Sequence, residues 1–185
     1  MTRITPINPI TAAGQAKELL DAVRAKMGSV PNLTRVMAAA PPVLEGYLGF
    51  SGALGHPSAL PAKVKEQLAL DIGEANGCDY CVSAHSFLGA RAGLSAAEVM
   101  DSRRGRAADP KTDALLRFAR AVLDARGRVT DDEVEAVRAA GYGDAEIAET
   151  VAHVALNVFT NFLNNVALTE IDFPKAHPLV AHAAA

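Results

Sequence analysis

Cysteine is scarce in this chain, which has only two in 185 residues. Two cysteines cannot cross-link a secreted scaffold of this size, which excludes the class of small disulfide-stapled domains. Charge of one sign is also lacking, because 18 basic and 21 acidic residues leave a formal net charge of −3. That balance is not typical of a nucleic-acid-binding protein. The one basic cluster, Arg103-Arg104 with Arg106, lies among loop-forming residues and indicates a solvated turn.

Long hydrophobic runs and strand-like alternation are missing as well. No apolar stretch is long enough to cross a bilayer, and residues 1–10 show no charged-then-apolar signal segment. We therefore expect a cytosolic (cytoplasmic) protein. Because 50% of the residues are hydrophobic, the chain can fill one core, and we expect a single domain over residues 1–185.

Helical periodicity is what the chain does contain, together with signals that start and stop helices. Ser95 with Glu98 and Thr130 with Glu133 are typical capping boxes at helix N-termini. Glycine and proline mark many of the remaining ends. We expect an all-α fold, with helices over about residues 12–27, a short stretch within 29–42, and then 41–54, 61–75, 78–92, 95 onward, 110–127, 130–141 and 144–166.

The last predicted helix, about residues 144–166, carries two adjacent apolar rows and little polar face. A helix this apolar must be buried on most sides, so we expect a second subunit to cover part of it. Asn157, Asn161 and Asn164 form a polar row, which we interpret as a hydrogen-bonded strip at a subunit contact. For His153 we expect a hydrogen-bonded core or interface position rather than a catalytic one.

Both cysteines fall in one short segment, EANGCDYCVSAH, at residues 74–85. Cys78 and Cys81 straddle a predicted helix start at spacing i, i+3, which is close enough for a disulfide. His85 follows Cys81 by four residues and shares its helix face. The partial positive charge of a helix N-terminus stabilises a thiolate, and a histidine alongside can take the thiol proton. These residues alone do not decide which sulfur would attack a substrate.

Three interpretations of this segment compete. The cysteines could be two small core residues, since free cysteine is a common core residue. They could bind zinc together with His85, with a fourth ligand such as His56 or a carboxylate. They could also form a dithiol–disulfide centre, which we favour because no second metal-binding pair exists. A thioredoxin fold is a poor host for that centre, since the alternating βαβ pattern is missing.

Glu66 lies twelve positions before Cys78, on the preceding predicted helix. It points away from the apolar stripe formed by Val64, Leu68 and Ile72. Its own face nevertheless holds mainly small or apolar residues rather than charged ones. A carboxylate in that setting either lies at an interface or is semi-buried and handles protons, and periodicity alone leaves both open.

The full pattern, Glu66-x11-Cys78-x2-Cys81-x3-His85, resembles the alkylhydroperoxidase D-like branch of the carboxymuconolactone decarboxylase superfamily. The core of the resemblance covers about residues 40–100, and the flanking segments are similar to the peroxidase-related subgroup. It implies a compact multi-helix domain that assembles into a homo-oligomer, a trimer or a hexamer. It also implies reduction of hydrogen peroxide or organic hydroperoxides without flavin, haem or metal. The disulfide would then be reduced by a dithiol of a lipoylated or thioredoxin-type protein.

Residue by residue, the resemblance makes Cys81 similar to the peroxidatic cysteine and Cys78 to the resolving one. His85 and Glu66 would form the proton relay that activates Cys81. The chain departs from the family at Tyr80, where alkylhydroperoxidase D has a histidine. Decarboxylase members lack the cysteine pair, so that activity is disfavoured. The alternative from another class is a non-catalytic redox-sensing or zinc-binding helical oligomer.

Overall fold

The computed structural model describes residues 2–55, 58–177 and 179, and over these ranges it is all-helical, as predicted. Each predicted helix is present, with ends that differ from the expectation by a few residues at most. The helices are α1 (Gly14–Met27), α2 (Asn32–Met37), α3 (Pro41–Ala53), α4 (Ala62–Ala75), α5 (Asp79–Arg91), α6 (Ala96–Arg103), α7 (Pro110–Asp124), α8 (Asp131–Ala139) and α9 (Asp144–Ala167).

Local signals in the sequence set these ends. Both predicted capping boxes are present, with the Ser95 hydroxyl accepting from the Glu98 N–H and the Glu98 carboxylate accepting from the Ser95 N–H. Thr130 and Glu133 cap α8 in the same way. Each box satisfies backbone donors that a helix start leaves without partners. No helix within the described ranges combines the length and apolar character that crossing a membrane requires.

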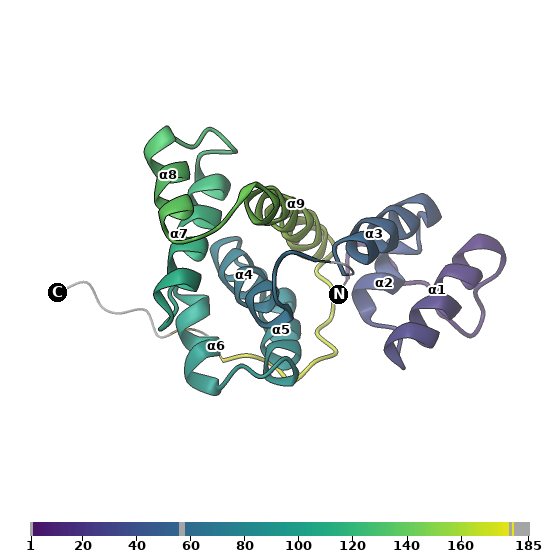
Figure 1. Cartoon of the computed structure of the whole chain (residues 1–185). Coiled ribbons are helices and arrows are strands. Elements are labelled where there is room, and N and C mark those ends of the chain that lie inside the picture. The colour runs from purple at the N-terminus through teal and green to yellow at the C-terminus, as the bar shows by residue number, and fades with distance from the viewer. Residues whose placement is uncertain (1, 56–57, 178, 180–185) are drawn as a thin grey trace.

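Helices α4 and α5 pack together at the centre of the molecule (Figure 1). Helices α6, α7 and α8 lie on one side of them, and α1, α2 and α3 on the other. The long helix α9 contacts both groups as well as α4 and α5. After α9 the chain runs past α5 to α6 (Figure 1).

Two hydrophobic clusters form the core. The α4–α7 cluster joins one face of α4 to α7, α8 and α9, and consists of Leu60, Val64, Leu68, Ile72, Leu115, Leu116, Phe118, Ala119, Val122, Val137, Tyr142 and Val154. The cysteine cluster joins α5 to the N-terminal helices, and consists of Leu20, Val23, Leu33, Met37, Ala38, Leu44, Cys78, Tyr80, Cys81 and Ala84. The predicted stripe of α4 thus lies in the first cluster.

Helix α9 leaves one expectation open and corrects another. Large apolar side chains remain exposed along it in the single chain, namely Val151, Phe159, Phe162 and Val166. The asparagine row, however, is buried within the chain, since Asn157, Asn161 and Asn164 are all at most 5% exposed. The prediction of a subunit-contact strip was therefore wrong. Periodicity placed the three amides on one row correctly, but the row faces inward, towards the residues around the cysteines.

Candidate active site

The cysteine pair lies at the start of α5. Cys78 is the N-cap residue, and its Sγ accepts a hydrogen bond from the Cys81 N–H at 3.2 Å. The two cysteines form a disulfide with Cα atoms 5.3 Å apart, within the span that such a bond requires. Gly77, at φ +59°, makes the tight reversal from α4 that allows this arrangement, because other residues rarely adopt that conformation.

A histidine–carboxylate pair stands beside the cysteines. His85 Nδ1 of α5 lies 2.7 Å from Glu66 Oε2 of α4. Both side chains are partly buried in the single chain, with His85 25% and Glu66 21% exposed. Gly89 of α5 packs against α4 here, and a Cβ at that position would be in ordinary contact with the Glu66 Cβ at 3.6 Å but would clash with Leu94 Cδ1 at 2.7 Å. With Nδ1 bound to the carboxylate, Nε2 is the ring nitrogen left for other chemistry.

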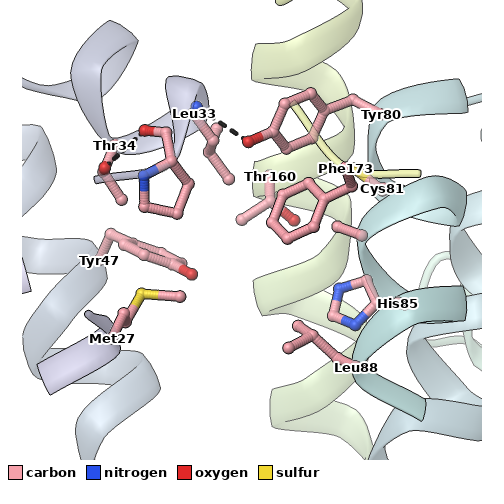
Figure 2. Close-up of a pocket in the computed structure, with 12 residues that line it drawn as sticks. Met27, Leu33, Thr34, Tyr47, Tyr80, Cys81, His85, Leu88, Thr160 and Phe173 are labelled. Carbon is pink, nitrogen blue, oxygen red and sulfur yellow. Dashed lines mark hydrogen bonds between the residues drawn. The ribbon is translucent and has the colours of Figure 1, made fainter. Parts of the chain in front are cut away.

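Cys81 and His85 open onto the same cavity, of about 80 Å³, between α5 and the N-terminal helices. Figure 2 shows the two side chains next to each other on one wall and Tyr47 with Met27 on the opposite wall. Most of the remaining lining is apolar or aromatic, namely Pro31, Leu33, Thr34, Tyr80, Ala84, Leu88, Thr160 and Phe173. The structure thus brings the predicted Glu66, Cys78, Cys81 and His85 into one region, with the sulfur and the imidazole facing a small, mainly apolar space.

A second cavity, of about 220 Å³, also reaches the histidine–carboxylate pair. His85, Tyr47 and Thr160 line both cavities, whereas Glu66 lines only the second. Burial and the nearby Glu66 carboxylate raise the pKa of Tyr47, so its hydroxyl stays protonated at neutral pH. The His85–Glu66 pair therefore lies between the small, mainly apolar cavity at the Cys81 sulfur and the second, larger cavity.

His153 lines this second cavity and is buried, as predicted. Burial lowers its pKa, which favours the neutral imidazole at physiological pH. Its Nε2 lies 3.6 Å from a Glu149 carboxylate oxygen and has no hydrogen-bond partner among the described residues. A core position is confirmed, but the hydrogen bond expected for the ring is not present at Nε2.

Comparisons with known proteins place this site in a wider context. The model of the carboxymuconolactone decarboxylase family matches residues 41–125, which contain all four candidate residues. The fold is similar to a peroxidase-related protein with an alkylhydroperoxidase core from Ralstonia eutropha JMP134, at a TM-score of 0.84 and 22% identity over 92% of each chain. The chain has an alkylhydroperoxidase D-like fold, and its residues 41–125 match the carboxymuconolactone decarboxylase family.

Other solved structures share this alkylhydroperoxidase D-like fold. A peroxidase-related protein from Silicibacter sp. TM1040 matches at a TM-score of 0.77 and 18% identity, over 91% of this chain and 92% of that one. The debrominase Bmp8 matches at a TM-score of 0.76 and 21% identity over 93% of each chain. Among curated proteins, none matches the sequence.

Sequence reasoning missed the C-terminal strap, which we define as residues 170–177. The Tyr80 hydroxyl donates to Asp172 Oδ1 at 2.8 Å and accepts from the Leu33 N–H at 3.2 Å. The other Asp172 oxygen accepts from the Asn32 N–H at 2.8 Å. Phe173 follows and packs edge-on against the Tyr80 ring, with centroids 5.8 Å apart. Phe173 of the strap thus lines the cavity, and no periodic pattern in the sequence of the strap indicates that role.

The described residues offer no further ligands for the zinc interpretation. Within residues 2–55, 58–177 and 179, no group of three histidine, cysteine, aspartate or glutamate side chains is arranged to hold a metal ion. His56, named as a possible fourth ligand, lies outside the described residues. His85 is directed to Glu66 instead.

Proposed function

We propose that this alkylhydroperoxidase D-like protein is a thiol-dependent peroxidase, which reduces hydrogen peroxide or organic hydroperoxides through a Cys78–Cys81 dithiol/disulfide cycle. One observation carries the proposal: a bonded cysteine pair at a helix N-terminus shares a cavity with an imidazole held by a carboxylate. The peroxidase-related names of two structural relatives agree with it.

The proton relay would begin at Glu66. Its carboxylate holds the Nδ1–H of His85 and thereby leaves Nε2 unprotonated, so that the ring acts as a base. His85 shares its helix face and its cavity with Cys81 and would draw the proton from that thiol. The N-terminus of α5 favours the thiolate that results.

The thiolate then attacks the terminal oxygen of the hydroperoxide. The O–O bond breaks, Cys81 becomes a sulfenic acid, and the departing alkoxide takes the proton from His85 and leaves as an alcohol, or as water when the substrate is hydrogen peroxide. The Cys78 thiol attacks the sulfenic sulfur, which forms the disulfide and releases one water. One hydroperoxide and two thiols thus give one alcohol, one water and one disulfide.

A dithiol must reduce that disulfide for a second turnover. Thiol–disulfide exchange requires the incoming sulfur to reach one of the two cysteines, and these are only 1% and 3% exposed. A slender dithiol arm, such as that of a lipoylated protein, would enter the cavity more easily than a sulfur fixed on a protein surface. A thioredoxin-type donor is the second choice. The cytosolic location expected from the sequence would supply either.

Substitution of the attacking sulfur tests the proposal most directly. We expect Cys81→Ser to lower hydroperoxide consumption with a dithiol donor to the background rate, because no peroxide-reactive thiolate remains. Cys78→Ser is the matched control: assayed without the dithiol donor, it should consume one equivalent of hydroperoxide, then stop with a sulfenic acid on Cys81 that dimedone traps. Wild-type turnover by Cys81→Ser would contradict the assignment. Turnover that is slow in the wild-type protein with every donor would favour a redox sensor.

A second candidate is reductive dehalogenation, favoured by the aromatic lining of the cavity and the likeness to Bmp8, which has been solved with 2,3,4-tribromopyrrole. The Cys81 thiolate would attack the halogen, the ring carbon would take a proton, and Cys78 would displace halide from Cys81 to form the disulfide. Two thiols are oxidised and one carbon–halogen bond is reduced to carbon–hydrogen. Halide release from a brominated pyrrole without hydroperoxide turnover would favour this activity.

We further propose that the protein is a homo-oligomer, a trimer or a hexamer. Phe162 and Val166 of α9 are 54% and 58% exposed, and apolar faces of this kind are typical of protein interfaces. A groove of about 690 Å³ lies beside Phe162 and is lined in part by Val122 and Leu123 of α7. Sedimentation should give three or six times the chain mass of 19.3 kDa, and a mass equal to one chain would contradict the proposal.

A further inference from the structure

The sulfur of Cys81 has a polar neighbour that the relay above does not use. Asn164 of α9 directs its Nδ2 to Cys81 Sγ at 3.3 Å, and the asparagine is only 3% exposed. Its Oδ1 is buried and has no hydrogen-bond partner among the described residues. The contact joins residues 83 positions apart, so it comes from the packing of α9 against the start of α5.

The other two amides of the same row have ordinary structural partners. Asn157 Nδ2 donates to the His153 carbonyl, and Asn161 Oδ1 accepts from Asn76 Nδ2 at 2.9 Å. Asn161 Nδ2, like Asn164 Oδ1, is buried without a partner among the described residues, so what sets Asn164 apart is that its N–H points at a sulfur. Asn164 instead directs its N–H donor to sulfur, which is a weak acceptor when neutral. A buried amide with one orphaned oxygen lowers stability, so packing alone would favour an apolar side chain here.

The contact becomes strong only when the sulfur is charged. A hydrogen bond to an ionised group is worth roughly twice a neutral one, and it shifts the pKa towards the charged form. We propose that Asn164 stabilises the Cys81 thiolate through its Nδ2–H. This inference rests on the proposed function for its role in turnover.

Asn164 and His85 would act on the same sulfur in different ways. His85 comes from α5 and accepts the proton, whereas Asn164 comes from α9 and stabilises the negative charge that remains. Cys78 has one donor, the backbone N–H of Cys81, and no side-chain amide on its sulfur among the described residues. Asn164 therefore also favours Cys81 over Cys78 as the attacking sulfur, a choice that the residue spacing alone left open.

The test measures the Cys81 pKa without any peroxide. The full chain carries Cys78→Ser so that one thiol remains, and its rate of alkylation by iodoacetamide is followed against pH. Adding Asn164→Leu, which keeps the branched shape and the number of side-chain heavy atoms but has no donor, should raise the Cys81 pKa by about one pH unit and slow alkylation at pH 7 about tenfold. Asn161→Ala is the matched control, because it removes a buried amide of the same row and should leave the pKa unchanged.

The outcomes separate this inference from the proposed function. An unchanged pKa in Asn164→Leu, or an equal rise in Asn161→Ala, would overturn it. If the leucine variant does not fold, Asn164→Ala gives the same comparison. A raised pKa in Asn164→Leu together with no hydroperoxide consumption by the wild-type protein would support the role of Asn164 and reject the peroxidase.

Discussion

The two hydrophobic clusters differ in what they contain. The α4–α7 cluster is dominated by aliphatic side chains, and Leu68, Leu115 and Leu116 in it are completely buried. The cysteine cluster includes the two cysteine sulfurs and the Tyr80 hydroxyl, and it borders the cavity that Cys81 and His85 line. Close packing makes the first cluster rigid. The second cluster instead borders a cavity and contains polar groups at the site. The two regions should therefore respond differently to substitution.

Helix α4 connects the two regions. Leu68 faces the α4–α7 cluster and is fully buried, while Glu66, two residues earlier, reaches across to His85. Side chains two positions apart on a helix point in different directions, so one helix can serve both clusters. The position of the carboxylate is thus fixed by the packing of leucines that take no part in the chemistry.

Glu66→Gln should have the largest effect on activity among substitutions that leave the sulfurs in place. The amide keeps the shape but cannot orient and polarise His85 as a carboxylate does. We expect hydroperoxide turnover to fall by about 10²- to 10⁴-fold, the usual contribution of acid–base catalysis. Unfolding by denaturant should change little, because Glu66 is partly exposed. Steady-state kinetics with a fixed dithiol donor measures the loss of turnover, and the midpoint of denaturant unfolding measures the change in stability.

The substitution to compare with Glu66→Gln lies in the α4–α7 cluster. Leu115→Ala removes a fully buried side chain and should lower the free energy of unfolding by about 2–5 kcal/mol. Turnover per folded molecule should stay near the wild-type value, since Leu115 lines neither cavity at the site. If Glu66→Gln were as destabilising as Leu115→Ala and equally active, the division between the two regions would fail.

The sequence predicted much of this because the information was local. Helix ends follow from caps and glycines within a few residues, and the spacing of Cys78, Cys81 and His85 on one helix face needs only helical geometry. Contacts between distant segments were not predictable. The inward direction of Asn164 depends on which neighbour α9 packs against, and periodicity gives a row without naming that neighbour. The partnership of Asp172 with Tyr80 joins residues 92 positions apart.

Tyr80→Phe should have a smaller effect, confined to the cysteine cluster and the strap. Removal of the hydroxyl leaves the buried Leu33 N–H without its acceptor and Asp172 without one donor. We expect a loss of about 1–3 kcal/mol in the free energy of unfolding, measured with denaturant. Tyr142→Phe is the matched control, because that ring lies in the α4–α7 cluster and is not bonded to the strap.

The same variant asks whether Tyr80, which stands where alkylhydroperoxidase D has a histidine, takes part in proton transfer. Burial and the Asp172 carboxylate raise the pKa of Tyr80 above its ordinary range, so the hydroxyl stays protonated throughout the physiological pH range. Its proton is already donated to Asp172, which leaves none for the substrate. The pH dependence of turnover in Tyr80→Phe should therefore follow that of the wild-type protein, with at most a modest change in rate. A large, pH-dependent loss would place the hydroxyl in the relay and extend the chemistry of the cysteine cluster to the strap.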